Sequence, residues 1–322
     1  MSATHHLLHH RDINTLYMAL LETLLREGEY ADPRKQKTYE IVPMTLILED
    51  SLQNIITIPE RNLNYSFMVA EWFWIMGARR DVASIAPYNK RIAEFSDDGV
   101  TYFGAYGPKI DAQRHYVISK LHNDPQSRQA VINIWRESPT QTRDVPCTVA
   151  MQFMIRNDKL LCNVFMRSSD AWLGVPYDLF NFSRIQAVIA ADLEIEPGAL
   201  SVTLGSSHIY EQHFNAAEDL LIANKHTVPK SGVSPVLRGH FGASFFRDLE
   251  EAVRAHPVTY GAALDESMHT FIDRDPIWYD YAEAMSYRFT KDIDHTGHIM
   301  DVVRTVASWN KKSQPSHRGK ED

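Results

Sequence analysis

The sequence predicts a single α+β domain. Segments with helical and strand-like patterns interleave along the chain without the regular strand–helix–strand alternation of a parallel α/β sheet. Two apolar runs, residues 147–156 and 159–167, flank Asn157-Asp158, a dipeptide that tolerates the positive φ of a tight hairpin turn. No internal repeat and no linker rich in Pro, Gly or Ser divides the 322 residues. We therefore expect one domain over residues 1–310.

The composition is that of a soluble globular protein, with 44% hydrophobic and 23% charged residues. The formal net charge of -8 argues against a large nonspecific nucleic-acid surface, because such binding depends on clustered Lys and Arg. An anionic small substrate would then be held by a few local arginines. Since no signal peptide or bilayer-spanning apolar run is evident, we expect no membrane partner and a cytoplasmic location.

The first predicted elements are a helix, a strand and a second helix. Residues 38–48 are rich in β-branched and apolar residues and predict a strand that leads into the core. A helix is expected from about Asn64 to Met76. Another is predicted over residues 13–26, with Asp12 available as its N-cap. Its apolar residues recur at helical spacing: Ile13, Leu16, Leu20 and Leu24.

The elements after the hairpin are a helix, a strand and a polar tail. The helix is predicted over residues 179–193 and is ended by Pro197-Gly198, and the strand follows over residues 200–204. Residues 311–322 are polar and uncapped, so we expect a disordered tail.

The N-terminal segment is rich in histidine. Its paired spacing would place two imidazoles on one helical face, which is one way to build a metal site. No cysteine or acidic partner stands within the run, and terminal His-rich segments are usually solvated, so we predict no metal. The residues are His5, His6, His9 and His10.

The two cysteines, Cys147 and Cys162, both lie in apolar, strand-like surroundings. Taken alone, each has the properties of a small buried hydrophobe, and we assign Cys162 to the core. Cys147 differs because the polar segment RSSDAWLGVPYD, residues 167–178, follows across the hairpin. Dense polar, Gly and Pro content at a strand end is typical of a site for an anionic ligand, so Cys147 is a candidate nucleophile.

Three segments carry a resemblance to a known family: DVPCTVAMQF from residue 144, RSSDAWLGVPYD from residue 167 and SHIYEQHF from residue 207. In this order and spacing they resemble the thymidylate synthase family, which includes the pyrimidine nucleotide hydroxymethylases. EWFW, GAYG and DPQSRQAV are weaker parallels, and the resemblance covers about residues 13–300. It implies a thymidylate synthase-like fold, with a large mixed sheet packed with helices and one sheet face at a dimer interface.

The resemblance also implies a chemistry. In this family a cysteine thiolate adds to C6 of the pyrimidine, and C5 then captures the methylene group of the co-substrate 5,10-methylenetetrahydrofolate. Cys147 occupies the position of that cysteine. Arg167 would bind the nucleotide phosphate and favour the thiolate, and Ser168 would add a phosphate hydrogen bond.

The family is homodimeric, and arginines of the neighbouring subunit complete the phosphate site. Arg128 matches the first member of a usual Arg-Arg pair, whereas Gln129 stands at the second. Loss of this guanidinium weakens the hold on phosphate or leaves it to another residue. Arg34 and Lys35 in the loop ADPRKQKT are the candidates.

Glu71 lies in the middle of an apolar helix, where a free carboxylate is costly to bury. Taken alone it is a surface glutamate; the resemblance implies a residue that organises water and proton transfer around the pyrimidine, for which a raised pKa is suited. Tyr106 resembles the tyrosine whose hydroxyl helps the proton leave C5, or is a loop tyrosine. Trp74 resembles a residue of the folate pocket, or is core. Arg79 and Arg80 contact the folate tail or nothing.

Two further sets of residues match ligand-contacting positions of the family. Asp170, Gly174 and Tyr177 match positions that contact the folate, although Asp170 taken alone could only close a turn. His208 and Tyr210 match the pair that hydrogen-bonds the 3'-hydroxyl of the sugar, whereas His208 in isolation reads as a core histidine.

Asp178 occupies the position that distinguishes the bases. Thymidylate synthases have asparagine there, whose amide accepts from the N3–H of uracil and donates to O4. An ionised carboxylate has no donor for O4, but it accepts from the amino group of cytosine and stabilises a protonated N3. Because an unpaired buried polar group gives strong discrimination, we predict that this site reads cytosine. The alternative is that Asp178 only caps the following helix.

Cytosine recognition indicates the branch that makes 5-hydroxymethylcytidylate from CMP or dCMP, in which water rather than hydride adds to the methylene intermediate. Thr148 stands where a histidine commonly follows the cysteine, and the chain lacks the short apolar ending of the methylating enzymes. Both features favour a wetter folate pocket. The sequence therefore predicts a cytidylate 5-hydroxymethylase. The alternatives are a thymidylate synthase or a deoxyuridylate hydroxymethylase, and a catalytically silent nucleotide- or RNA-binding relative, which the retained motif residues disfavour.

Overall fold

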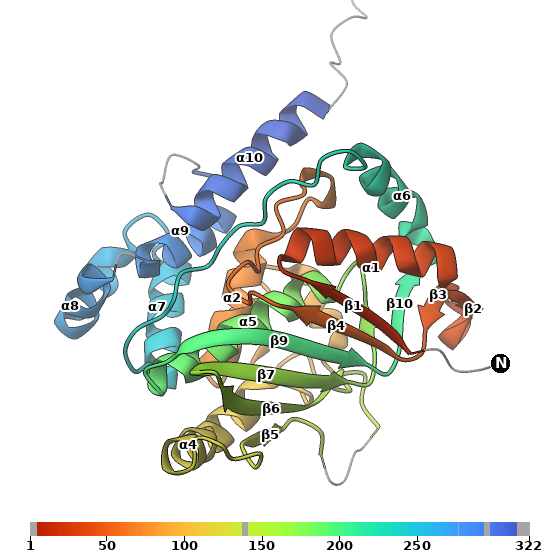
Figure 1. The fold of residues 1–322 in the computed structure, drawn as a ribbon. Coiled ribbons are helices and arrows are strands. Elements are labelled where there is room, and N and C mark those ends of the chain that lie inside the picture. Colours follow the sequence, from red (N-terminus) through yellow and green to blue (C-terminus); the bar gives the residue numbers. More distant parts are fainter. Residues whose placement is uncertain (1–4, 137–140, 276, 293–296, 314–322) are drawn as a thin grey trace, which may run out of the picture.

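The computed structural model describes residues 5–136, 141–275, 277–292 and 297–313 of the chain. A six-stranded mixed sheet crosses the molecule (Figure 1). From one edge to the other, its strands are β1 (His6–His10), β4 (Met44–Leu48), β9 (Glu196–Leu204), β7 (Lys159–Met166), β6 (Thr148–Arg156) and β5 (Val131–Asn133).

Helices cover one face of this sheet (Figure 1). Two of them, α1 (Ile13–Glu27) and α5 (Val175–Asp192), lie on the strands, while α2 (Tyr65–Met76) packs against α5 and α4 (Gly107–Asn123) packs at the β5 edge. This arrangement confirms the predicted α+β fold with a large mixed sheet packed with helices. The other helices are α3 (Val82–Ile85), α6 (Phe214–Ala223), α7 (Ala243–Ala255), α8 (Glu266–Arg274), α9 (Ile277–Thr290) and α10 (His298–Ser313).

A second, smaller sheet forms beside the first. It contains β2 (Glu29–Ala31), β3 (Thr38–Ile41), β10 (Ser207–Tyr210) and β8 (Ser169–Asp170), in that order. Because β8 follows β7 after two residues, the polar segment after the hairpin is held between the two sheets. Short 3-10 helices also connect elements in the described parts of the chain: Pro33–Lys35, Pro59–Arg61, Lys90–Phe95, Glu211–His213 and Tyr260–Ala263.

The predicted N-terminal helix is confirmed, and the following strand is corrected. Asp12 caps α1 by accepting a hydrogen bond from the backbone N–H of Thr15 at 3.1 Å. Residues 38–48, however, form two strands, because Pro43 has no N–H to continue a ladder. β3 joins the small sheet and β4 the large one.

The predicted hairpin is confirmed. β6 and β7 pair antiparallel from Arg156↔Lys159 to Thr148↔Met166. Asn157 and Asp158 form the turn with φ of 50° and 56°. A β-bulge interrupts the ladder between Thr148 and Ala150, so β6 carries one more residue than β7 at the end next to Cys147.

The helix predicted over residues 179–193 begins earlier, at Val175. Gly174 is its N-cap and Asp178 lies inside its first turn, so the alternative that Asp178 only caps this helix was wrong. The helix ends at Asp192. Pro197 does not end it but lies in β9, beyond the part of that strand that pairs with β4, where a missing N–H is tolerated.

The two ends of the chain also differ from expectation. His6–His10 form strand β1, parallel to β4, so these histidines do not share a helical face. Residues 311–313, expected in the tail, form the last turn of α10, and residues 314–322 of the predicted tail lie outside the described residues. No helix within the described ranges is long and apolar enough to span a bilayer.

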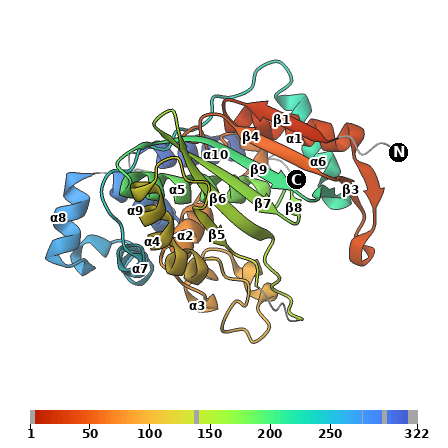
Figure 2. The ribbon, with the colours of Figure 1, turned by 60° about the horizontal axis from the view of Figure 1, so that its bottom comes forward.

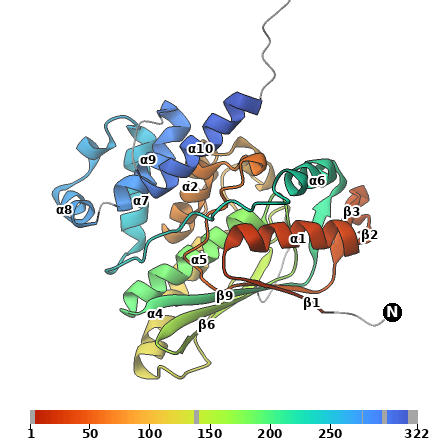
Figure 3. The same cartoon turned by 45° about the horizontal axis from the view of Figure 1, so that its top comes forward.

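Helix α2 is buried on nearly all sides, as its run of apolar and aromatic residues requires. Trp72 packs against Phe246 of α7, with ring centroids 5.4 Å apart, and against Trp278 of α9, at 6.1 Å. Figure 3 shows α7, α8 and α9 gathered at the end of the molecule opposite β1, β2 and β3. Glu71 is therefore a carboxylic acid on a core helix.

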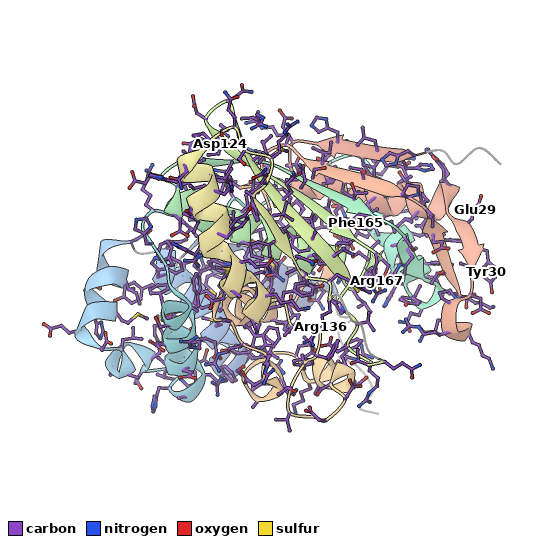
Figure 4. The ribbon with its side chains drawn as sticks, turned by 90° about the horizontal axis from the view of Figure 1, so that it is seen from below. Glu29, Tyr30, Asp124, Arg136, Phe165 and Arg167 are labelled. Atoms are coloured by element: carbon purple, nitrogen blue, oxygen red, sulfur yellow. The ribbon has the colours of Figure 1, made fainter. Side chains whose placement is uncertain are left out.

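The underside of the large sheet carries apolar side chains that the chain itself does not cover. Phe165 of β7 is 45% exposed and Val131 of β5 is 37% exposed. Figure 2 turns this side forward, and Figure 4 shows Phe165 on it. Such a surface is suited to burial against another protein surface.

Candidate active site

Cys147 and Arg167 lie at neighbouring ends of the hairpin strands. The N–H of Arg167 donates to the carbonyl of Cys147 at 2.8 Å, and its Nη2 lies 3.6 Å from the cysteine Sγ. The guanidinium is fixed by three further hydrogen bonds, to the carbonyls of Val145 and Pro146 and to the hydroxyl of Ser168, each 3.0 Å long. Arg167 thus lies beside the thiol, as expected.

The thiol of Cys147 is partly buried, and burial raises its pKa above the ordinary value. The positive charge of Arg167 lowers this pKa, and the negative charge of Asp178 raises it. Arg167 acts in the direction that the sequence predicted, but burial outweighs it. The resting thiol is therefore protonated near neutral pH, and forming the thiolate requires that its proton be taken up nearby.

Asp178 points its carboxylate at the small sheet, where the hydroxyl of Ser169 donates to Oδ2 at 2.9 Å. Burial raises the pKa of Asp178 to about 6, while the Ser169 hydrogen bond lowers it and the charge of Asp170 raises it. The carboxylate is mostly ionised at pH 7. No hydrogen bond to its Oδ1 is found within the described ranges, so this oxygen is available to a ligand.

Glu71 extends from α2 toward the same region. Asn181 of α5 donates from Nδ2 to Glu71 Oε2 at 2.7 Å. Burial, followed by the charge of Asp178, raises the pKa of Glu71 to about 8, a direction that suits the role implied by the resemblance. Glu71 and Asp178 together therefore hold one proton and one negative charge at pH 7.

Tyr106, at the start of α4, contacts the residue that follows Cys147. Its hydroxyl oxygen accepts a hydrogen bond from the N–H of Thr148 at 3.1 Å, which leaves the phenolic proton free to be donated. Burial raises the pKa of Tyr106 well above its usual value, and the charges of Cys147 and Asp178 raise it further. Tyr106 is thus a neutral donor and acceptor next to the sulfur.

His208 and Tyr210 lie on β10, with their rings edge to face and 5.2 Å apart. Burial lowers the pKa of His208, although the charges of Asp170 and Glu40 raise it, so the imidazole is neutral at pH 7. Arg34, the candidate substitute for the missing guanidinium, lies with its Nη2 3.5 Å from the Tyr210 hydroxyl. The loop that carries Arg34 is therefore brought to this site.

The residues that the resemblance assigns to folate lie in α2 and around the start of α5. They are Trp74, Asp170, Gly174 and Tyr177. The Oδ1 of Asp170 accepts from the N–H groups of Trp172 at 2.7 Å and Leu173 at 3.1 Å, so it does close the turn before α5. The Tyr177 hydroxyl accepts from the N–H of Asn64 at 3.2 Å. Trp74 is buried and donates from Nε1 to the Asp81 carbonyl at 3.0 Å.

Gly174 is packed so closely that a side chain would not fit without movement. A Cβ placed on it would lie 3.1 Å from the Asp170 carbonyl oxygen, 3.1 Å from Ser169 Oγ and 3.2 Å from Asp178 Oδ2. The glycine therefore permits the close approach of Ser169 and Asp178.

Arg128, which the resemblance assigns to the phosphate site of a neighbouring subunit, lies away from the site of its own chain. Arg128 is exposed and lies beside Gln152, whose Nε2 donates to the Arg128 carbonyl. Because Gln152 follows Cys147 by five residues along β6, the two lie roughly 17 Å apart. Figure 4 likewise shows Asp124, which precedes Arg128 by four residues, far from Arg167.

Arg79 is already paired. It contacts Asp81 at 3.5 Å, Glu250 at 3.9 Å and also Glu251. The alternative that Arg79 reaches the folate tail is therefore disfavoured, because its guanidinium joins the segment after α2 to α7. Glu251 lies 172 residues further along the chain, next to Glu250, and no local pattern signals either partner.

Three residues of the site were missed by sequence reasoning. Ser169 stands inside a quoted motif, and its role needed the contact to Asp178. Asn181 is the one amide in the apolar run LFNF. This pattern could have indicated a buried polar side chain that needs a hydrogen-bond partner. Asp144 accepts from the N–H of Gly104 at 2.6 Å, and its charge raises the pKa of Cys147.

The site thus combines two guanidinium groups, a neutral imidazole, a thiol and a pair of carboxyl groups that share a proton. This set can bind an anion at one end, present a sulfur nucleophile at the other and exchange protons beside it. No cluster of three or more metal-ligating side chains occurs among the described residues.

Comparison with known proteins agrees with this arrangement. Residues 15–238 match the family model described as thymidylate synthase. The chain is also 33% identical over 221 residues to the deoxyuridylate hydroxymethyltransferase of Bacillus phage SP01. That alignment covers 62% of this chain and 58% of the phage protein, so it spans less than two thirds of the relative.

Proposed function

Because this chain belongs to the thymidylate synthase family, we propose that it is a folate-dependent enzyme that transfers a one-carbon unit to C5 of a pyrimidine nucleoside monophosphate. The proposal rests on one contact above all: the Cys147 sulfur 3.6 Å from the Arg167 guanidinium, at the ends of paired strands. That contact supports a binding mode in which Arg167 holds the phosphate of the nucleotide while the pyrimidine ring lies against the Cys147 thiol.

The phosphate and sugar would be bound along the line from Arg167 to β10. Arg167 and Ser168 supply donors to phosphate oxygens, and Arg34 adds a second guanidinium near Tyr210. His208, neutral at pH 7, and Tyr210 bind the 3'-hydroxyl of the sugar.

The ring chemistry requires a proton acceptor for each proton released. The Cys147 thiolate adds to C6, Tyr106 assists loss of the C5 proton, and the Glu71 and Asp178 pair holds protons within the site. 5,10-Methylenetetrahydrofolate supplies the carbon, with Trp74, Asp170, Gly174 and Tyr177 as its proposed contacts. Asp170 uses only Oδ1 for its turn, and no partner of its Oδ2 is found within the described ranges, which leaves this oxygen for the pterin.

We further propose that the product is 5-hydroxymethylcytidylate, from CMP or dCMP. The Oδ2 of Asp178 is held by Ser169, and Oδ1 of the largely ionised carboxylate accepts from the cytosine amino group. The phage relative carries hydroxymethyltransferase in its name, which favours water over hydride as the final nucleophile.

The second candidate is hydroxymethylation of deoxyuridylate, which the name of the phage relative favours. It would require Asp178 to be protonated, so that its O–H donates to O4 of uracil. With a pKa of about 6 for Asp178, this form is a minority at pH 7.

A homodimer would complete the phosphate site. The exposed apolar side chains under the sheet offer the interface, and Arg128, which is too far from Cys147 of its own chain, would reach the site of the partner.

The test is incubation with methylenetetrahydrofolate and, separately, CMP, dCMP and dUMP, with product mass and dihydrofolate absorbance followed together. A hydroxymethylated cytidylate without dihydrofolate is the expected result. Methylated dUMP with dihydrofolate would overturn the proposal, and hydroxymethylated dUMP would establish the second candidate. If no nucleotide is modified, the alternative of a catalytically silent nucleotide- or RNA-binding protein is favoured.

A further inference from the structure

Asn181 holds an unusual position in the site. Its side chain is buried, with 4% of the residue exposed, and Nδ2 donates to Glu71 Oε2 at 2.7 Å. Its Oδ1 is also buried and has no hydrogen-bond partner within the described ranges. A buried amide carbonyl without a partner is unfavourable and calls for a ligand or a water molecule.

The location of Asn181 suggests what that partner is. Asn181 follows Asp178 by three residues on α5, so the two side chains lie on the same face of the helix. Glu71 of α2 faces both: it accepts from Asn181, and Asp178 influences its protonation. The amide therefore stands at the edge of the proposed ring-binding site, next to the acid that exchanges protons there.

We propose that Asn181 is a positioning residue that orients Glu71 through Nδ2 and, through Oδ1, holds the water molecule that completes the hydroxymethyl group. This inference rests on the proposed function. It assigns the two ends of one amide to two tasks: Nδ2 fixes the carboxyl group that takes a proton, and Oδ1 accepts from the O–H that stays on the product.

The step balances as follows. Glu71, protonated at pH 7, first gives its proton to the tetrahydrofolate nitrogen that leaves the methylene carbon. The water oxygen then forms a bond to the exocyclic methylene carbon at C5, and one water proton passes to the Glu71 carboxylate so formed. The π electrons of the methylene group move into the ring and then form the C5–C6 double bond. The C6–S bond breaks, and the sulfur of Cys147 leaves with its electron pair. The second water proton remains on the product hydroxyl, directed at Asn181 Oδ1.

The experiment measures the hydration step against the steps before it. Nucleotide carrying tritium at C5 reports formation of the methylene intermediate by tritium release, and chromatography reports the hydroxymethyl product. The wild-type enzyme is expected to give about one product for each tritium released. Asn181→Leu, which keeps the size and removes both polar ends, is expected to lower product per tritium at least tenfold. Added 2-mercaptoethanol should then capture the intermediate as a thioether.

Two further variants separate positioning from folding. Asn181→Ser restores an acceptor and is expected to recover most of the product per tritium. Gln186→Leu is the matched control: it removes another buried amide of α5, which bonds to the carbonyls of Leu160 and Gly198 away from the site. It is expected to lower stability and leave product per tritium unchanged.

The results distinguish the two proposals. If the wild-type enzyme hydroxymethylates no nucleotide, the proposed function fails. If the wild-type enzyme does so and Asn181→Leu keeps the wild-type ratio, or lowers tritium release and product equally, only the role of Asn181 is overturned. If Asn181→Leu does not fold, the ratio of hydroxymethyl product to released tritium is measured in Asn181→Ala instead, and the same two outcomes apply.

Discussion

Ser169 and Asp178 are joined by a hydrogen bond of 2.9 Å, in which the serine hydroxyl donates to carboxylate Oδ2. Ser169 lies in β8, two residues after Arg167, and Asp178 in the first turn of α5. The bond thus couples the residue proposed to read the base to the strand that carries the proposed phosphate ligands. It also determines which carboxylate oxygen is left for the nucleotide, and the first two predictions follow from it.

Replacing Asp178 by asparagine should switch the preferred base. The amide of Asp178→Asn can donate to O4 of uracil and accept from its N3–H, so kcat/KM for dUMP should rise relative to dCMP by about 100-fold or more. The measurement is kcat/KM for both nucleotides in both proteins. An unchanged ratio would remove Asp178 from base recognition.

The activity on cytidylate should have an acid limb set by Asp178. Burial raises the pKa of this carboxyl to about 6, so the ionised form that accepts from the cytosine amino group is lost as the pH falls through 6. The profile of kcat/KM against pH should therefore fall about tenfold per pH unit below that value. In Ser169→Ala the limb should move to higher pH, because the lost hydrogen bond favoured the ionised form.

Glu71→Gln should lower activity and raise stability at alkaline pH. The folded pKa of Glu71, about 8, exceeds the ordinary value of 4.5, so its contribution to folding is present below pH 4.5 and is lost as the pH rises through 8. The uncharged variant escapes this loss and should be more stable at pH 9 by about 1–3 kcal/mol. Urea unfolding at pH 5 and pH 9 tests it; equal stability changes at both would contradict the raised pKa.

Gly174→Ala should impair the site by crowding. The added methyl group would stand 3.1 Å from Ser169 Oγ and 3.2 Å from Asp178 Oδ2, so the hydrogen bond between them must lengthen. We expect a loss of stability of about 1 kcal/mol and a larger relative loss of cytidylate activity. Ala199→Gly, on the underside of β9, is a control for small changes of volume outside the site. Full activity of Gly174→Ala would show that the close packing is dispensable.

Mixing two inactive variants should restore activity if Arg128 acts across a dimer. Cys147→Ser lacks the nucleophile, and Arg128→Ala lacks the donated guanidinium. A mixed dimer has one site with an intact Cys147 and a partner that still carries Arg128. An equal mixture, after dissociation and reassembly, should reach about a quarter of wild-type activity. No recovery, with mixed dimers detected by mass spectrometry, would place Arg128 outside the partner site.

The parts of the fold that local patterns determine were predictable. The α1 helix, its Asp12 cap and the turn at Asn157-Asp158 follow from spacing and turn chemistry. The continuous strand over residues 38–48 was wrong because apolar content outweighed the effect of Pro43 in the prediction. The start of α5 was misplaced because Gly174 and Pro176 were read as loop residues, although Pro is favoured in the first turn of a helix.

The candidate site divides in the same way. Most of the site residues inside the three motifs could be named from the sequence, since the resemblance supplied their roles. Ser169 and Asp144 also lie inside these motifs, but their roles depend on contacts to Asp178 and Gly104. Asn181 offered only an amide in an apolar run, and its role depends on a contact between α5 and α2. The partner Glu251 of Arg79 could not be predicted, because the contact joins the segment after α2 to α7. The raised pKa of Glu71 was foreseeable in direction from the apolar neighbours of α2.

Because of the bulge at Val149, the number of residues in β6 determines where the Cys147 thiol points. Successive side chains of a strand point to opposite faces of a sheet, so the number of residues between the turn at residues 157–158 and Cys147 determines the face toward which Cys147 points. The extra residue in the bulge changes that number by one. Deleting Val149 would turn the Cys147 thiol to the opposite face of the sheet, although every proposed nucleotide- and folate-binding residue would still be present. By contrast, two residues added to each strand at the turn would preserve this parity. Length variation among relatives should therefore be confined to the tip of this hairpin, and a deletion next to the cysteine should mark a copy that has lost its chemistry.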